Sequence, residues 1–137
     1  MAVLVYTESW NGSFKKASFE AVSYAAQLAN KLGTEVIALT IASTDSAANL
    51  GNYGATKVLS IANDSMATFN NQAYANAIIA AAEANAAETI VISNTNNGKS
   101  IAPIVAAKRD AGLITNVIEL PNSTDPFIVK RKTFSVI

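Results

Sequence analysis

Residues 89–112 carry the pattern that most restricts how this chain can fold. A short apolar run, TIVIS, precedes a polar loop, and an amphipathic stretch then follows and ends at Gly112. This order predicts a buried strand, a loop and a helix. Such units alternate in proteins whose parallel sheet is covered by helices, because parallel strands need a long crossover that is usually helical.

The same alternation continues along the rest of the chain. Its β-branched, apolar runs are short and nearly continuous, which is typical of strands that are buried on both faces. A small, polar segment at residues 43–55 has room for one helical turn. The predicted strands are residues 2–7, 35–41, 57–61, 89–93, 113–120 and 127–134.

Three longer stretches place apolar residues at helical spacing. In the first, Ser13 is the expected N-cap and Gly33 is the left-handed residue beyond the end. The second enters through Asn70, and the third spans residues 99–111 with Pro103 in its first turn, where the missing N–H costs little. The apolar faces of the first two consist of Phe14, Ala17, Ala21, Tyr24, Ala25, Leu28, Leu32, Tyr74, Ala75, Ile78, Ile79 and Ala82.

Together these elements predict one α/β domain over residues 1–137. The mostly parallel sheet should be doubly wound, with helices on both faces in three layers. Half of the residues are hydrophobic, which is enough for a core of ordinary extent in a chain of 137 residues.

Composition removes several classes of function. The chain has no cysteine and no histidine, which excludes thiol nucleophiles, disulfides, thiolate or imidazole metal sites and serine–histidine–aspartate triads. Lys plus Arg equals Asp plus Glu, so no net field attracts nucleic acid or anionic lipid. Only 15% of the residues are charged, which is low for a small domain. Such a surface is compatible with a protein partner that covers part of it. A hydrolase could still use Lys, Asp or Glu, but histidine, the usual acid–base group near neutral pH, is missing. We expect no catalytic and no metal-binding residues.

The chain shows no targeting or membrane-spanning signal. Its start, MAVLVYTES, lacks the basic region and the long apolar run of a signal peptide. No apolar stretch approaches the roughly 18 residues that span a bilayer. Since a chain without disulfides fits a reducing compartment, we expect a cytoplasmic protein without membrane insertion, or a mitochondrial-matrix protein if the source is eukaryotic.

The loop before the third helix is the candidate ligand site. Gly98-Lys99-Ser100 nearly matches the phosphate loop G-x-x-x-x-G-K-[ST], but Ser93 stands where the motif has its first glycine. Free N–H groups and the dipole at a helix N-terminus attract anions. Ser93, Asn94, Gly98, Lys99 and Ser100 are therefore candidates for a vestigial anion or nucleotide site. The alternative is an ordinary helix start, with glycine for the turn and serine for the cap.

Ligands of open α/β sheets bind beyond the carboxyl ends of the strands, where the strand order switches. Here those ends are residues 7–9, 42–44, 61–63 and 93–95, and all four are small or polar. Glu8 has no second carboxylate nearby in the sequence, so paired acid–base chemistry has no support.

Five short motifs occur in a characteristic order. They are VLVYTE at residues 3–8, LGNYGATKV at 50–58, GKS at 98–100 with Pro103 and Ala106-Ala107, AGL at 111–113 and VKRK at 129–132. In this order and spacing they resemble the amino-terminal domain of the electron transfer flavoprotein alpha subunit. The resemblance covers essentially the whole chain.

That resemblance implies a fold related to adenine-nucleotide-binding domains. It also implies a heterodimer with a beta subunit, which carries electrons from flavin dehydrogenases, including those of fatty acid β-oxidation, to a membrane-bound quinone reductase. In the family, FAD is held mainly by a carboxyl-terminal domain. We therefore expect FAD in a full-length subunit and none in this chain alone. The family's AMP belongs to the beta subunit, so the loop at residues 93–100 is expected to be largely structural.

The alternative from another class is a nucleotide-binding sensor similar to universal stress proteins. Those proteins carry a phosphate loop with more glycines than residues 94–100 contain. A nucleotide-cleaving or adenylating enzyme would need a pyrophosphate loop, and residues 7–13 do not contain one.

Overall fold

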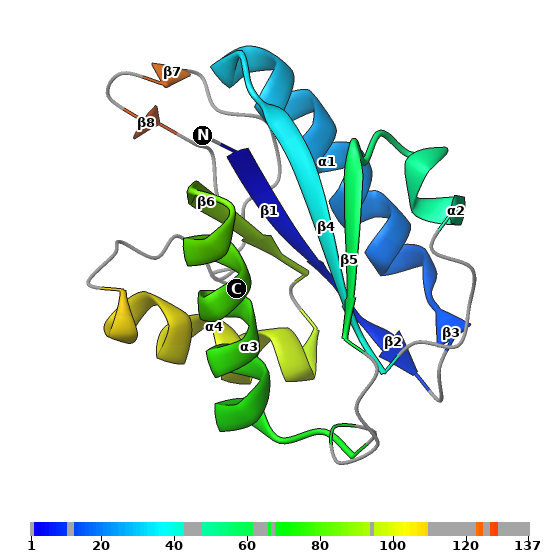
Figure 1. The fold of residues 1–137 in the computed structure, drawn as a ribbon, viewed down its shortest axis with the longest axis vertical. Helices are drawn as coiled ribbons and strands as arrows, with labels where there is room; N and C mark the ends of the chain where they lie inside the picture. Colours follow the sequence, from blue (N-terminus) through cyan, green and yellow to red (C-terminus); the bar gives the residue numbers. More distant parts are fainter. Residues whose placement is uncertain are drawn as a thin grey trace, which may run out of the picture.

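Within the residues that the structure describes, four strands form one parallel sheet (Figure 1). The strand order is β5 (Lys57–Ile61), β4 (Glu35–Ile41), β1 (Ala2–Thr7) and β6 (Ala87–Ile92), and each neighbouring pair is parallel. This arrangement confirms the predicted α/β class. The computed structural model describes residues 2–10, 13–42, 48–61, 66, 68–93, 95–109, 123–124 and 127–128.

Helices cover both faces of the sheet, so the described residues form three layers (Figure 1). One face carries α1 (Lys16–Leu32) and the short α2 (Ala48–Gly51). The opposite face carries α3 (Asn71–Ala84) and α4 (Asn96–Lys108). The doubly wound arrangement expected from the sequence is confirmed, and α2 is the helical turn expected within residues 43–55.

The strand β1 is buried along its whole length because it lies inside the sheet and contributes to both cores. Successive side chains of a strand point to opposite faces. Leu4 and Tyr6 therefore pack in the cluster that contains α3 and α4, whereas Val3 and Val5 pack in the cluster that contains α1. This double burial explains why the strand is apolar at consecutive positions, not at alternate ones.

The start of α1 differs from the prediction, while its end agrees with it. Ser13 is not the N-cap. It lies in β3 (Ser13–Phe14), which pairs antiparallel with β2 (Ser9–Trp10), and the helix begins at Lys16. Phe14 has the spacing of a helical residue, but it belongs to the β2–β3 hairpin. Its ring is buried there and packs against Phe19, so the helix begins only after it. Gly33 ends the helix with φ 69° and ψ 36°, as predicted.

The helix α3 follows the prediction closely. Asn70 is its N-cap, and the side-chain oxygen of Asn70 accepts a hydrogen bond from the N–H of Ala73 at 3.0 Å. Tyr74, Ala75, Ile78 and Ala82 are buried on the inner face, and Ile79 is partly buried beside them.

The helix α4 begins at Asn96, earlier than the predicted residue 99. Thr95 is its N-cap, and the threonine hydroxyl accepts a hydrogen bond from the Gly98 N–H at 3.0 Å. Because this cap lies upstream of the GKS motif, Gly98 is already helical and Pro103 lies beyond the first turn. The predictions for the helix start and for the place of Pro103 were wrong.

Two further predicted strands agree with the structure only in part. β6 begins at Ala87 and ends at Ile92, against the predicted 89–93. β7 (Ser123–Thr124) and β8 (Phe127–Ile128) form a short antiparallel pair, so the strand predicted at 127–134 is seen in its first two residues. The strand predicted at 113–120 and Gly112 lie outside the described residues. The helix end predicted at residue 111 was wrong, because α4 ends at Lys108 with Arg109 as its C-cap. Among those residues, none of the helices is both long and apolar enough to cross a bilayer.

Candidate functional site

The carboxyl ends of β1 and β6 form the switch point of the sheet. From β1 the chain proceeds through β4 to β5 on one side, and it then returns to β6 on the other side of β1. Open α/β sheets bind ligands beyond a switch point of this kind. Tyr6 pairs with Ile92 in the sheet register, so the segments that follow, with Glu8 on one and Thr95 on the other, leave the sheet side by side.

The Glu8 carboxylate lies at this end of the sheet and is held by the start of α4. Its Oε2 accepts a hydrogen bond from the Thr95 hydroxyl at 2.5 Å, and its Oε1 accepts one from the Asn97 side-chain amide at 3.0 Å. Only 5% of the Glu8 surface is exposed. Burial of a carboxylate is costly unless donors compensate it, and hydrogen bonds to a charged acceptor are among the strong ones. Glu8 thus joins the segment after β1 to the start of α4.

The sequence did not reveal this role of Glu8. Its partners are 87 and 89 residues away along the chain, and only the strand order brings them together. The available signal was an acidic residue directly after the first strand, facing a loop that is rich in hydroxyl and amide side chains.

Gly98 is required by packing at this position. A Cβ built on residue 98 would overlap the carbonyl oxygen of Ser93 and would lie 3.1 Å from the Ile92 Cγ2. The glycine therefore lets the first turn of α4 approach the end of β6. The Gly98 N–H, which a phosphate would need, already donates to the Thr95 hydroxyl. This geometry corresponds to the structural alternative for the GKS motif.

The three other candidate residues that the structure describes, Ser93, Lys99 and Ser100, do not converge on one point. The Ser93 hydroxyl donates to the carbonyl of Ala17 at 3.2 Å, which joins the end of β6 to α1. The Ser100 hydroxyl donates to the carbonyl of Asn97 at 2.8 Å within α4. Lys99 is exposed. Asn94 lies outside the described residues.

Other described hydroxyl groups along this edge also have partners within the protein. Thr7 donates to the carbonyl of Leu39 at 2.8 Å, and Thr40 donates to the Ser60 hydroxyl at 3.1 Å. The fully buried Ser18 of α1 donates to the backbone carbonyl of Glu8. These contacts join strands and helices to one another, so the hydroxyl groups of the described edge have structural roles.

The phenol of Tyr6, near the end of β1, is buried. Burial first, and then the negative charge of Glu8 and the neighbouring Tyr74, raise the pKa of Tyr6 far above its ordinary value. The rings of Tyr6 and Tyr74 meet edge to face with their centroids 6.3 Å apart. Tyr6 is therefore neutral at physiological pH. Among the described residues, no group of three or more acidic, cysteine or histidine side chains could hold a metal ion.

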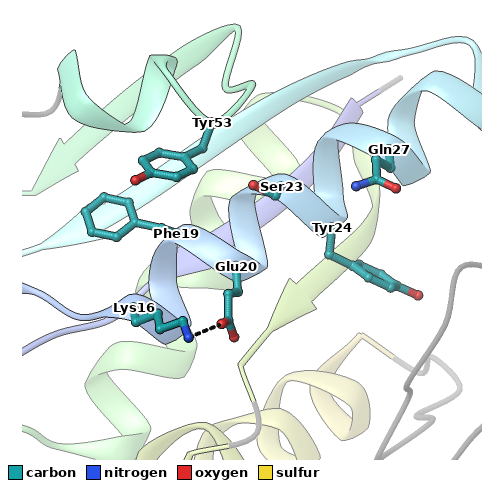
Figure 2. A pocket seen from close by; sticks show the side chains of 7 residues that line it. All are labelled: Lys16, Phe19, Glu20, Ser23, Tyr24, Gln27 and Tyr53. Atoms are coloured by element: carbon teal, nitrogen blue, oxygen red, sulfur yellow. Dashed lines mark ion pairs between the residues drawn. The ribbon is translucent and has the colours of Figure 1, made fainter.

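A shallow hollow lies elsewhere, on the outer face of α1 (Figure 2). Phe19 of α1 stacks on Tyr53, which follows α2, with ring centroids 4.6 Å apart. Lys16 and Glu20 form an exposed ion pair of 3.7 Å at one end of the hollow. Tyr53 is 44% exposed. The hollow combines three aromatic rings with polar side chains, and this mixture is found at surfaces that contact proteins.

A comparison with known families gives a match over nearly the whole chain. The family model described as "Electron transfer flavoprotein domain" matches residues 3–137.

Curated relatives carry related names. An electron transfer flavoprotein subunit alpha of Clostridium acetobutylicum is 29% identical over 120 residues, covering 86% of this chain and 36% of the relative. The lactate dehydrogenase (NAD(+),ferredoxin) subunit LctC of Acetobacterium woodii is 31% identical over 127 residues, covering 90% of this chain and 30% of the relative. The chain thus spans about a third of the length of these relatives.

Among solved structures, a universal stress protein in complex with cAMP superposes with a TM-score of 0.48 at 17% identity. That superposition covers 82% of this chain and 94% of the other.

Proposed function

Because the chain belongs to the electron transfer flavoprotein domain family, we propose that it is the amino-terminal scaffold and partner-binding domain of an electron transfer flavoprotein alpha subunit. The family match over residues 3–137 carries this proposal. The internal hydrogen bonds of the switch-point edge support a structural role, since the side chains that would bind a ligand there hold the domain together. On this proposal the domain is not itself an enzyme.

The described residues do not fit FAD as a resident cofactor. At the switch point, the Thr95 hydroxyl, the Asn97 amide and the Gly98 N–H already have partners. The hollow on α1 is lined by aromatic and exposed side chains from one helix and one loop. The proposal therefore places FAD in another part of a full-length subunit, and the redox chemistry belongs to its isoalloxazine ring.

The partner in this proposal is an electron transfer flavoprotein beta subunit. The heterodimer would accept electrons from flavin dehydrogenases and pass them to a quinone reductase, in the cytoplasm or in the mitochondrial matrix. The low charged fraction of the chain, 15%, fits a domain with part of its surface covered by protein.

Co-expression with a beta subunit encoded in the same genome tests the proposal. Light scattering after size exclusion should show a complex with one copy of each chain, and each chain alone is the control. Flavin absorbance of this chain purified alone should be negligible. Separate elution of the two chains would contradict the partner role, and stoichiometric FAD in the isolated chain would contradict the placement of the cofactor.

Calorimetry with ATP and AMP tests the alternative, a nucleotide-binding sensor. The hydrogen bonds of Gly98 and Thr95 predict no binding at micromolar concentrations. Micromolar affinity for either nucleotide would favour the sensor.

A further inference from the structure

The outer side of α1 combines a partly exposed aromatic stack with an ion pair (Figure 2). Phe19 and Tyr53 form the stack, and Tyr53 remains 44% exposed. Lys16 and Glu20, which lie on either side of Phe19 along the helix, form the ion pair. We call these four residues the α1 patch. Stable protein interfaces place aromatic anchors at the centre and charged groups at the rim, and the α1 patch has both.

The backbone holds Tyr53 in its exposed position. The Tyr53 N–H donates to the carbonyl of Leu50 and the Gly54 N–H to the carbonyl of Gly51, both at 3.1 Å. Gly54 has φ 116°, and a Cβ there would lie 2.5 Å from the Ala26 Cβ, so this turn packs directly on α1. An aromatic side chain on a turn that is already ordered loses little conformational entropy when a partner covers it.

The charges of the α1 patch are complementary to those of an identical patch. Lys16 and Glu20 are both exposed and lie one helical turn apart. When two copies of α1 run antiparallel about a two-fold axis midway between these residues, each Lys16 faces the Glu20 of the other copy. The same axis places the two aromatic stacks side by side, because Phe19 lies between the two charged residues. The net charge of the chain is zero, so no net repulsion opposes the approach of a second copy.

We propose that the α1 patch binds a second copy of this chain in a two-fold dimer, with the stacks of Phe19 and Tyr53 at its centre and two reciprocal Lys16–Glu20 pairs at its rim. A two-fold interface must be complementary to itself, and a patch with one charge of each sign meets that condition. An unrelated protein would have to present an acid and a base at the same spacing, whereas a second copy supplies both by symmetry. This inference does not rest on the proposed alpha-subunit role, because it concerns the chain alone.

Sedimentation velocity of the purified chain tests the association itself. The α1 patch is small, so we expect a weak dimer, with half of the chains dimeric at about 100 µM and monomers at about 5 µM. A wild-type chain that remains monomeric up to about 500 µM would overturn the proposal.

Charge exchange tests whether the partner is a second copy. Lys16→Glu and Glu20→Lys each place like charges opposite one another at both ends of the dimer, so each should weaken association about tenfold. The double variant Lys16→Glu/Glu20→Lys restores both pairs and should associate within about threefold of the wild type. Lys16 and Glu20 are exposed, so these variants should fold.

Lys99→Glu is the matched control. It makes the same change in net charge as Lys16→Glu, at an exposed position of α4 on the opposite face of the sheet, and it should associate as the wild type does. A double charge exchange that associates as weakly as the single variants would overturn the proposal, because the two charges would then not face each other across a two-fold axis.

Tyr53→Ser tests the aromatic centre and separates a second copy from another partner. It should weaken self-association at least about tenfold, whereas Tyr53→Phe keeps the ring and should behave as the wild type. Equal association of Tyr53→Ser and the wild type would overturn the proposal. So would a chain that is monomeric alone but loses its complex with a beta subunit in Tyr53→Ser, because the beta subunit would then occupy the α1 patch.

Discussion

The backbone of Gly98 lies directly against the carbonyl oxygen of Ser93, so close that a Cβ on residue 98 would overlap that oxygen. The two residues belong to consecutive elements, the start of α4 and the end of β6, and their contact sets how near the helix comes to the sheet. The hydrogen bonds from Thr95 and Asn97 to Glu8 depend on that approach.

Gly98→Ala should therefore destabilise the domain although alanine favours helix. The methyl group must displace α4 from β6, and overpacking of this kind costs about 2 kcal/mol in the free energy of unfolding. Gly51→Ala is the matched control, because a Cβ there meets nothing within 4 Å. Urea unfolding of both variants measures the difference. Equal stability of Gly98→Ala and the wild type would mean that the helix shifts at no cost.

The Thr95 hydroxyl should stabilise the contact between the start of α4 and the segment that follows β1. Thr95→Val keeps the shape but removes both the cap of α4 and one donor to the buried Glu8 carboxylate. We expect a loss of about 2 kcal/mol in the free energy of unfolding. Thr95→Ser retains the hydroxyl and should lose about 0.5 kcal/mol or less. If serine and valine destabilise equally, the methyl group and not the hydroxyl carries the effect.

The inner face of α3 offers a paired test of the core. Ile78 is fully buried between α3 and the sheet, whereas the adjacent Ile79 is only partly buried. Ile78→Ala should lower the unfolding free energy by about 3 kcal/mol, because it leaves a cavity, and Ile79→Ala by about 1 kcal/mol. Thermal unfolding of the two variants gives the order, and a reversed order would contradict the burial pattern.

The same helix shows what the sequence could predict. The cap at Asn70 and the face formed by Tyr74, Ile78 and their neighbours follow from local spacing alone, and the structure has both. The strands β1 and β4 were equally clear, because burial on both faces leaves a continuous apolar run. Local sequence patterns therefore predict a helix or strand when the spacing of its own apolar side chains determines which of its faces are buried.

Contacts between distant segments could not be predicted in this way. Phe14 has the right spacing for α1, but a hairpin with β2 takes it out of the helix. A glycine before lysine and serine fits a phosphate loop and a close helix–strand contact equally well, and the sequence does not show that the Ser93 carbonyl lies against Gly98. The partners of Glu8 became visible only with the strand order.

Titration of Tyr6 should make the domain sensitive to alkali. Burial, the charge of Glu8 and Tyr74 raise the pKa of Tyr6 above its ordinary value of 10.0, so in strong alkali the folded protein retains a proton that the unfolded chain loses. This contribution to stability is fully present below pH 10 and is lost as the pH rises above it, by up to about 1.4 kcal/mol per pH unit.

Tyr6→Phe should keep the packing and remove this dependence. Urea unfolding at about pH 9 and about pH 11 should show a smaller loss of stability in Tyr6→Phe than in the wild type. Some dependence should persist, because burial also raises the pKa of Tyr24 and of Tyr74. Tyr53→Phe, at the exposed ring on the hollow of α1, is the matched control. An equal loss of stability in Tyr6→Phe and the wild type would show that the Tyr6 phenol is not the group that couples folding to alkaline pH.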